Sequence, residues 1–150
     1  MPQQSPAGEE IGPNRQVIDE FRARGGTVGG RFAGLPLLLL TTVGARSGRR
    51  RTVPLTYVAD GERYLVAAGA AGANPAWYHN LLAHPAVTVE VGTAVLDAVA
   101  RPAAGAERNG LFTRYVAEQP QLASYQAMAS REVPMIVLTP ARPALPEAER

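Results

Sequence analysis

The stretch LLLLTTVGARSGRRRTVPLTYVADGERYLVAA, residues 37–68, predicts three consecutive strands. Residues 37–42 form a continuous apolar and β-branched run, which is typical of a strand buried on both faces. Residues 52–59 alternate well enough to form a second strand, and residues 64–68 form a third. The Asp60-Gly61 turn between the last two strands is short, so we expect antiparallel pairing there.

The remaining sequence adds helices and a second hairpin. Asn74 and Pro75 predict a helix start, with Asn74 as the N-cap and Pro75 at the first helical position, where a missing N–H costs nothing. We also expect a short helix capped by Asn14, strands over 87–91 and 95–100, helices over 106–117 and 122–130, and a last strand over 134–138. About six strands joined mostly by short turns form an antiparallel sheet, and such a sheet leaves its edge strands least exposed when it closes into a barrel. The residues therefore predict a mainly β, α+β protein built on an antiparallel barrel with inserted helices.

The composition is that of a single folded domain. The 150 residues are 46% hydrophobic and 19% charged, which is ordinary for a globular chain able to bury a core. We expect residues 1–13 to form a flexible tail and residues 14–150 to form one domain. No signal peptide or membrane-spanning run is visible, and the absence of cysteine fits a cytoplasmic protein. The net charge of only +2 argues against nucleic acid as a partner.

Several common classes of catalytic and metal site are excluded. There is no cysteine, so thiolate catalysis and thiolate zinc sites are ruled out. The G-x-S-x-G, G-x-G-x-x-G and Walker A motifs do not occur. His79 and His84 are not at the i, i+4 spacing that places two ligands on one helix face. We therefore expect no metal site.

The loop between the first two strands carries a cluster of positive charge. It reads GARSGRRR, residues 44–51. Its glycines let the backbone approach a ligand, Ser47 adds a hydroxyl, and guanidinium groups match phosphate or carboxylate oxygens. Arg51 begins the next strand, so its side chain is the most firmly directed. The alternatives to an anion site are a solvated basic turn and a nonspecific nucleic-acid patch.

Aromatic side chains follow the predicted helix start and recur near the C-terminus. The Trp77 ring either packs in the core with nearby leucines or lies against a planar heterocycle. Asn80 is one helical turn beyond Trp77, so its amide can reach the same neighbourhood. Tyr115 and Tyr125 are candidate proton donors or ring contacts, with ordinary half-buried packing as the alternative. These features predict an anion site beside an aromatic helix start, without naming the ligand.

Five segments of the chain match a known family in one collinear order. They are LLLTTxGxRSGxxR (residues 38–51), PL (54–55), DG (60–61), NPAWYHNL (74–81) and HPxVxV (84–89). In this combination the stretch from Leu37 to Gly92 closely resembles the deazaflavin (coenzyme F420)-dependent nitroreductase and quinone reductase family. This stretch covers over a third of the chain, and the segments together are highly specific.

The resemblance implies a split β-barrel of the flavin-reductase and FMN-binding type, with coenzyme F420 in a groove. It implies that the following residues bind the cofactor: Ala45, Arg46, Ser47, Arg51, Thr52, Val53, Pro54, Leu55, Ala67, Ala68, Gly69, Ala70, Ala76, Trp77, Tyr78, His79 and Asn80. Many relatives carry Ser-Lys-Gly-Gly where this chain has Gly69-Ala70-Ala71-Gly72. Family members active on nitroimidazoles carry tyrosines in the C-terminal helix, of which only Tyr125 remains here. Tyr125 is therefore the expected catalytic side chain.

The resemblance also implies an activity. An F420-dependent oxidoreductase transfers a hydride from the reduced coenzyme to a small organic acceptor, such as a quinone, a nitro compound or an activated alkene. The alternatives are a non-catalytic F420-binding or carrier protein, and an FMN or haem binder on the same barrel. Some relatives use an N-terminal segment to sit on membranes. Residues 2–13 are polar here, so we expect at most peripheral association without stable insertion, and a monomer or a homodimer.

Overall fold

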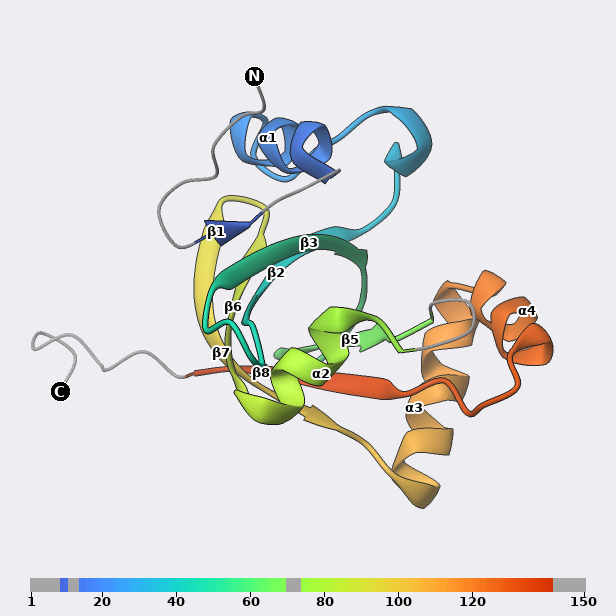
Figure 1. Ribbon diagram of the computed structural model, residues 1–150. Coiled ribbons are helices and arrows are strands. Elements are labelled where there is room, and N and C mark those ends of the chain that lie inside the picture. Colours follow the sequence, from blue (N-terminus) through green and yellow to red (C-terminus); the bar gives the residue numbers. More distant parts are fainter. Residues whose placement is uncertain (1–8, 11–13, 70–73, 142–150) are drawn as a thin grey trace, which may run out of the picture.

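The computed structural model describes residues 9–10, 14–69 and 74–141, and its centre is a curled eight-stranded sheet (Figure 1). The strands are β1 (Glu9–Glu10), β2 (Leu37–Val43), β3 (Arg50–Thr56), β4 (Val58–Asp60), β5 (Arg63–Ala67), β6 (Ala86–Val91), β7 (Ala94–Pro102) and β8 (Met135–Pro140). The helices are α1 (Arg15–Ala23), the short 3-10 helix η2 (Gly30–Phe32), α2 (Ala76–Ala83), α3 (Gly105–Glu118) and α4 (Gln121–Met128). Among the described residues β1 pairs with β3 in parallel, and the other pairings are antiparallel.

The sheet curls because one stretch of chain supplies strands near both of its ends. The strand order is β1-β3-β2-β6-β7-β8-β5-β4, and β3 and β4 are separated in sequence only by Tyr57. The Tyr57 N–H donates to the Pro36 carbonyl at 3.2 Å, and its ring meets Tyr64 edge-on at 5.4 Å between centroids. The chain therefore bends at Tyr57 and passes from one side of the sheet to the other, which gives a split barrel rather than a flat sheet.

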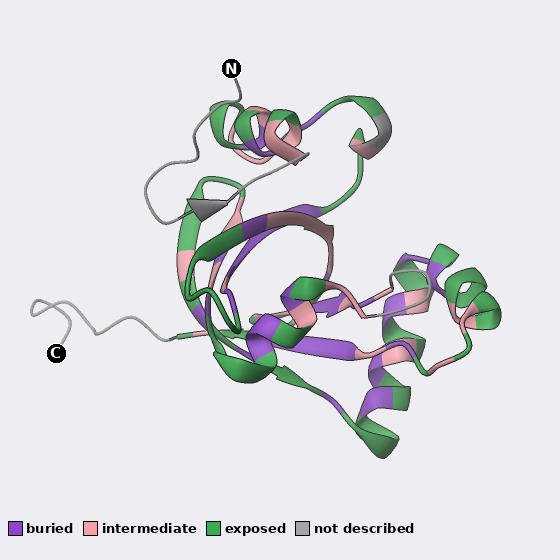
Figure 2. Ribbon diagram, viewed as in Figure 1, coloured by how far each residue is buried: buried purple, intermediate pink, exposed green. Residues whose placement is uncertain are grey.

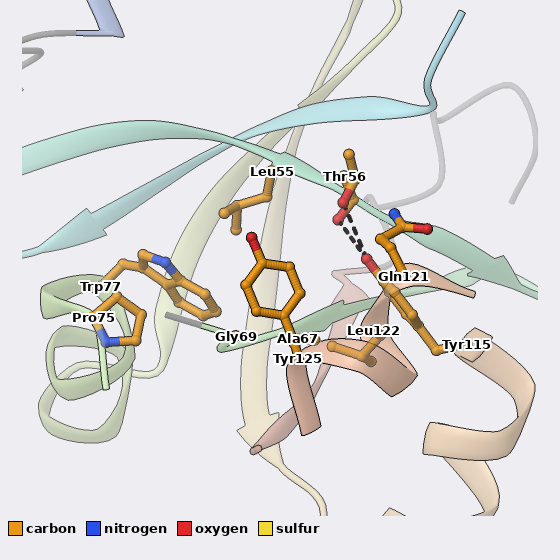
Figure 3. Close-up of a pocket in the computed structure, with 10 residues that line it drawn as sticks. All are labelled: Leu55, Thr56, Ala67, Gly69, Pro75, Trp77, Tyr115, Gln121, Leu122 and Tyr125. Atoms are coloured by element: carbon orange, nitrogen blue, oxygen red, sulfur yellow. Dashed lines mark hydrogen bonds between the residues drawn. The ribbon is translucent and has the colours of Figure 1, made fainter. Parts of the chain in front are cut away.

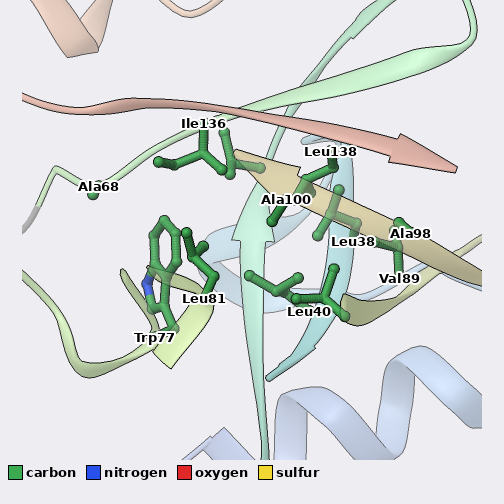
Figure 4. Packing of buried hydrophobic residues seen from close by; sticks show 12 residues of the cluster. Leu38, Leu40, Ala68, Trp77, Leu81, Val89, Ala98, Ala100, Ile136 and Leu138 are labelled. Carbon is green, nitrogen blue, oxygen red and sulfur yellow. The ribbon is translucent and has the colours of Figure 1, made fainter. Parts of the chain in front are cut away.

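The inside of this barrel is filled by apolar side chains from its strands (Figure 4), and most of β2 and β8 is buried (Figure 2). Leu38 and Leu40 of β2 and Ile136 and Leu138 of β8 are fully buried there. Helix α2 lies across the open end of the barrel, and its Trp77 and Leu81 point into the same cluster (Figures 1 and 4). Because these two side chains anchor α2 in the core, the start of the helix is held in a fixed place.

Helix α1 packs on the outside of the barrel. Ile18 and Phe21 are buried against Leu37 and Leu39 in an apolar cluster of their own. Next to it, the guanidinium of Arg22 donates two hydrogen bonds to the Glu90 carboxylate of β6, at 3.1 and 2.9 Å. The helix is therefore docked by both apolar contact and a bidentate ion pair.

Helices α3 and α4 stand together on another side of the sheet (Figure 1). Their buried hydrophobic side chains are Leu111 and Tyr115 from α3 and Leu122 from α4. These pack against the faces of β4, β5 and β8 that point away from the barrel interior, through Val58, Leu65, Met135 and Val137. The two helices thus form a second, smaller core beside the main one.

The predicted fold class is confirmed, with differences in detail. The sheet has eight strands instead of about six, because the run over 52–59 divides at the Tyr57 bend and because residues 9–10 pair with β3. That short pair lies within the predicted tail, whose other residues, 1–8 and 11–13, lie outside the described residues. No described helix is both long and apolar enough to cross a membrane.

The predicted N-cap at Asn74 is wrong by one residue. Helix α2 begins at Ala76, and Pro75 is the N-cap, with φ −70° and ψ 160°. The proline ring fixes a φ that suits the extended conformation of an N-cap residue. At α1, Asn14 does occupy the predicted N-cap position, but its side chain makes no capping hydrogen bond.

Candidate functional site

Two cavities share the start of α2 as a wall. The first, which we call the arginine pocket, has a volume of about 650 Å³ and is lined by Gly44, Ala45, Arg46, Ser47, Arg51, Ala76, His79 and Asn80. The second, the aromatic pocket, has a volume of about 280 Å³ and is lined by Leu55, Thr56, Ala67, Gly69, Pro75, Trp77, Tyr115, Gln121, Leu122 and Tyr125 (Figure 3). Successive residues of the helix start face different cavities, because Pro75 and Trp77 line one and Ala76 lines the other.

The loop that forms the arginine pocket is a tight, internally bonded turn between β2 and β3. The Gly44 N–H donates to the Arg49 carbonyl at 2.8 Å, and the Gly48 N–H donates to the Gly44 carbonyl at 3.0 Å. The Ser47 hydroxyl accepts from the Arg49 N–H at 3.1 Å. A Cβ on Gly44 would collide with the Ser47 Oγ, and Gly48 has a φ of +71°, which strains other residues, so both positions favour glycine.

Asn80 fastens this loop to α2 and β2. Its Oδ1 accepts a hydrogen bond from the Ala45 N–H at 2.9 Å, and its Nδ2 donates to the Thr42 Oγ1 at 3.1 Å. Asn80 and Thr42 are both buried. The Asn80 amide is therefore occupied by the protein itself, and its contribution to the site is to hold the loop at the helix start.

The side chains that line the arginine pocket make it electropositive. Arg46 and Arg51 are exposed side chains on its lining, and no carboxylate side chain is among the lining residues. Ser47 adds a hydroxyl group next to them. Guanidinium groups on a turn with little freedom are the protein groups best suited to phosphate and carboxylate oxygens.

The aromatic pocket is uncharged by contrast. Its ten lining residues include no arginine, lysine, aspartate, glutamate or histidine. Tyr125 stands between Trp77 on one side and Tyr115 on the other, with its hydroxyl directed towards Leu55 (Figure 3). Trp77 is nearly buried and Tyr125 is 52% exposed, so the cavity is closed on the barrel side and open beside α4. Such a lining suits a planar, neutral ring.

Tyr115 is part of the wall of the aromatic pocket and not an available acid. Its hydroxyl lies 3.1 Å from the Thr56 Oγ1 and also donates to the Thr56 carbonyl at 3.4 Å. Burial raises the pKa of Tyr115, and the hydrogen bond with Thr56 opposes that rise only in part. The side chain therefore stays neutral and ties α3 to the end of β3. Of the two tyrosines considered from the sequence, only Tyr125 presents an exposed hydroxyl to the cavity.

The structure brings most of the sequence-predicted site residues to these two cavities. The arginine pocket takes Ala45, Arg46, Ser47, Arg51, Ala76, His79 and Asn80, and the aromatic pocket takes Leu55, Ala67, Gly69, Trp77 and Tyr125. Residues so distant in sequence meet because side chains of β3, β5, α2 and α4 surround the same aromatic pocket.

Five of the described residues expected at the site line neither cavity. The Thr52 side chain is buried and lies 2.7 Å from Thr41, Oγ1 to Oγ1, between paired strands. Val53 and Tyr78 pack against the barrel core, and Ala68 is fully buried within it. Pro54 is half-buried on β3. Ala70, also expected at the site, lies outside the described residues.

Other lining residues were not among the expected site residues. They are Gly44, Thr56, Pro75, Gln121 and Leu122, whereas Tyr115 had been considered from the sequence as a proton donor or ring contact. Gly44 and Pro75 lie inside the matched segments and adjoin expected residues, so the motif itself was a usable signal. Thr56 follows Leu55 at the end of β3. Gln121 and Leu122 carry no local signal, because their place depends on how α4 packs on the second core.

Comparison with known proteins gives consistent results. The family model described as F420H(2)-dependent quinone reductase matches residues 13–140. An F420H(2)-dependent quinone reductase of Mycobacterium tuberculosis is 35% identical over 125 residues, which cover 79% of this chain and 84% of that protein.

Solved structures agree with this match. An F420-H2 dependent reductase, FDR-A, is 38% identical, with a TM-score of 0.63 over 69% of this chain and 93% of its own. A second structure, a domain-swapped dimer, is 35% identical, with a TM-score of 0.66 over 83% of this chain and 95% of its own. The heme storage protein HutZ from Vibrio cholerae shares the fold alone, at 20% identity and a TM-score of 0.52 over 85% of this chain and 90% of its own.

The resemblance seen in the motifs over residues 37–92 is thus confirmed over nearly the whole chain. The same relatives confirm the predicted use of coenzyme F420 and the predicted class of enzyme, an oxidoreductase. The chain belongs to the F420H(2)-dependent quinone reductase family.

Proposed function

We propose that this chain holds coenzyme F420 across the two pockets and reduces a quinone bound in the aromatic pocket. The observation that carries the proposal is the division of one site into a cationic and an uncharged part with α2 between them. A coenzyme with a planar ring at one end and an anionic phosphate and tail at the other needs both environments in that order.

The residues present fit such a coenzyme. Arg46, Arg51 and the Ser47 hydroxyl form a donor set suited to phosphate and carboxylate oxygens. Leu55 and Trp77 supply apolar surface for the ring.

The chain's own part in catalysis is to position two planar molecules and to limit water. Reduced F420, when bound, supplies a hydride at low potential. Leu122 and Tyr125 on the α4 side give the acceptor an apolar surface, while Leu55 and Trp77 exclude water from the barrel side of the cavity. The Tyr125 hydroxyl then hydrogen-bonds an oxygen of the acceptor and delivers a proton as the acceptor is reduced. Proximity and orientation supply most of the rate.

The shape and charge of the aromatic pocket restrict the acceptor. A cavity of about 280 Å³ without charged side chains fits a neutral one- or two-ring molecule. A quinone meets this requirement and offers carbonyl oxygens to Tyr125. Nitro compounds and activated alkenes of one or two rings also fit this cavity. Their turnover rates, compared with that of a quinone, show which class of acceptor is preferred.

The proposal is tested by turnover with menadione. Reduced F420 and the purified chain are mixed without oxygen, and loss of reduced coenzyme is followed with and without menadione. Oxidation of the coenzyme that depends on both protein and menadione supports the proposal. Tight binding of F420 without turnover of any quinone, nitro compound or alkene identifies a carrier instead. Turnover with reduced FMN alone rejects the deazaflavin assignment.

Assembly and location are further parts of the proposal. One related structure is a domain-swapped dimer, which favours a homodimer among the two assemblies expected from the sequence. Sedimentation of the purified chain distinguishes the two. A cytoplasmic protein without stable membrane insertion remains the prediction from the sequence, and fractionation of cells that express the chain tests it.

A further inference from the structure

A buried arginine outside both pockets holds helix α4 in place. Arg108 of α3 is only 7% exposed. Its Nε and Nη2 donate to the Val133 carbonyl at 3.1 and 2.7 Å, and its Nη2 also donates to the Gln126 Oε1 at 2.8 Å. The guanidinium lies 4.5 Å above the centre of the Phe112 ring. A single side chain thus joins α3, α4 and the segment that leads to β8.

The charge of Arg108 is balanced mainly by neutral groups. Its ion pair with Glu132 is long, at 3.8 Å, and the Glu132 side chain is 67% exposed. Burial of a guanidinium costs free energy that neutral acceptors offset only when their geometry is good. A gain in stability therefore explains a buried arginine at position 108 poorly. A role in fixing the positions of its hydrogen-bond partners explains it better.

Gln126 passes this constraint to α4. Its Oε1 accepts from the Val133 N–H at 2.8 Å as well as from Arg108, and its Nε2 donates to the Arg131 carbonyl at 2.9 Å. The Gln126 side chain is therefore bonded on both of its polar ends. Rotation or displacement of α4 would break these hydrogen bonds together.

The helix that is held in this way carries one wall of the aromatic pocket. Tyr125 directly precedes Gln126, Leu122 lies one turn before it, and both line the cavity. Helix α4 has eight residues and no capping hydrogen bond from a side chain, so its own stability is marginal. Its position depends on the burial of Leu122 and on the hydrogen bonds of Gln126.

We propose that Arg108 is a positioning residue for the acceptor, acting through Gln126 on the wall formed by Tyr125 and Leu122. This inference rests on the proposed function, because it assigns the aromatic pocket to the acceptor. Arg108 touches neither ligand. It sets the distance across the cavity between α4 and Trp77, and so decides how well a planar acceptor is held over the coenzyme.

The test replaces Arg108 by lysine and by methionine. Lysine keeps the charge but cannot make the forked contact, and methionine keeps a long apolar stem without charge. Arg114→Met is the matched control, because Arg114 lies on the same helix but bonds Glu118 and the Ala59 carbonyl, not α4. Val133→Ala is the control for lost stability, since it removes buried side-chain atoms and leaves the backbone partner of Arg108 in place.

We expect Arg108→Lys to raise the KM for menadione about tenfold, because a displaced wall loses contacts that the acceptor makes equally in the bound state and in the transition state. The kcat and the affinity for oxidised F420, measured by Trp77 fluorescence, should stay within about twofold. Hydrogen exchange of the α4 amides should accelerate while that of α2 does not. Arg114→Met should leave the KM unchanged. If lysine at position 108 still hydrogen-bonds Gln126, the same KM, affinity and exchange measurements are made on Arg108→Met, which cannot form this bond.

Two results would overturn the inference. One is an unchanged KM in both Arg108 variants. The other is an equal rise of KM in Val133→Ala at an equal loss of Tm, which would show a merely structural effect. If the unmodified chain does not reduce menadione, the proposed function fails by itself. Hydrogen exchange then still decides the role of Arg108, because unchanged exchange in α4 would reject it.

Discussion

The arginine pocket and the aromatic pocket share α2 but are built in different ways. The arginine pocket is formed by one tight turn whose shape comes from its own hydrogen bonds and from Asn80. The aromatic pocket is formed by side chains of β3, β5, α2, α3 and α4, which come together only in the folded chain. A local turn is enough to bind the anionic part of the coenzyme, which is the same in every turnover. The acceptor instead contacts side chains whose positions depend on tertiary packing.

This difference between the two pockets should have its largest effect on the free energy of unfolding. Asn80→Leu leaves the Ala45 N–H and the buried Thr42 hydroxyl without their partner. We expect a loss of about 3 kcal/mol in the free energy of unfolding, since the buried Thr42 hydroxyl left unpaired costs about 1–3 kcal/mol and the lost part-buried bond to the Ala45 N–H adds about 1 kcal/mol. Urea denaturation measures it. His79→Leu, an exposed change on the same helix, is the control and should change stability by less than about 0.5 kcal/mol. A loss below about 1 kcal/mol for Asn80→Leu would mean that the turn holds itself.

The next effect concerns the anionic part of the coenzyme. Arg51→Ala should weaken F420 binding by about 1–3 kcal/mol, the value of a charge-assisted hydrogen bond. Equilibrium titration with oxidised F420 measures the change. Arg50→Ala is the matched control, because Arg50 is the preceding residue of β3 and does not line the pocket. Equal losses in the two variants would indicate general attraction by positive charge and not a specific contact.

A smaller effect is expected on the side of the acceptor. Tyr125→Phe should lower kcat/KM for menadione about tenfold, because water partly replaces a hydroxyl on a half-exposed side chain. F420 affinity should not change, since Arg46 and Arg51 are untouched. Steady-state kinetics with reduced F420 measures the first quantity and titration the second. An unaltered kcat/KM would assign the proton to water alone.

The smallest effect concerns alkaline pH. Burial raises the pKa of Tyr115, so the folded chain keeps this proton after the unfolded chain, with an ordinary tyrosine pKa near 10, begins to lose it. Stability from this group is therefore full below pH 10 and declines above it, by at most about 1.4 kcal/mol per pH unit. Thermal unfolding between pH 8 and about 11 measures the decline. Tyr115→Phe should reduce its slope.

Tyr57→Phe is a control for thermal unfolding at alkaline pH. The pKa of Tyr57 is also raised, by burial and by Tyr64, so Tyr57→Phe should reduce the slope as well. Tyr57 is less buried, and its share should be the smaller one. An identical pH profile for the unmodified chain and Tyr115→Phe would mean that the hydroxyl of Tyr115 is not shielded in solution.

The fold could be predicted from the sequence where the signal is local. The run over Leu37–Val43, the Asp60-Gly61 turn and the hairpin around Gly92-Thr93 each predict their strands with small errors at the ends. The bend at Tyr57 was not predictable, because nothing in the alternation over 52–59 shows that the chain changes edges there. The start of α2 was misplaced by one residue, since proline suits both the N-cap and the position after it.

The candidate site follows the same division. The residues of the arginine pocket lie in two short segments, 44–51 and 76–80, and both carried the motif that predicted them. Of the aromatic pocket, Leu55, Gly69 and Trp77 were expected, but Gln121 and Leu122 were not. Helix α4 reaches the cavity through the second core and the Arg108–Gln126 bond, which are contacts between distant parts of the chain.

Binding of F420 across the two pockets can be followed through the fluorescence of Trp77. It is the only tryptophan and lines the aromatic pocket, so its fluorescence reports on a ring bound there. The protein is titrated with oxidised F420 and separately with FMN, with a correction for inner-filter absorption. We predict saturable quenching by F420, weakened in Arg51→Ala, and little response to FMN. Quenching by FMN alone, or by neither molecule, would contradict the proposed binding of F420.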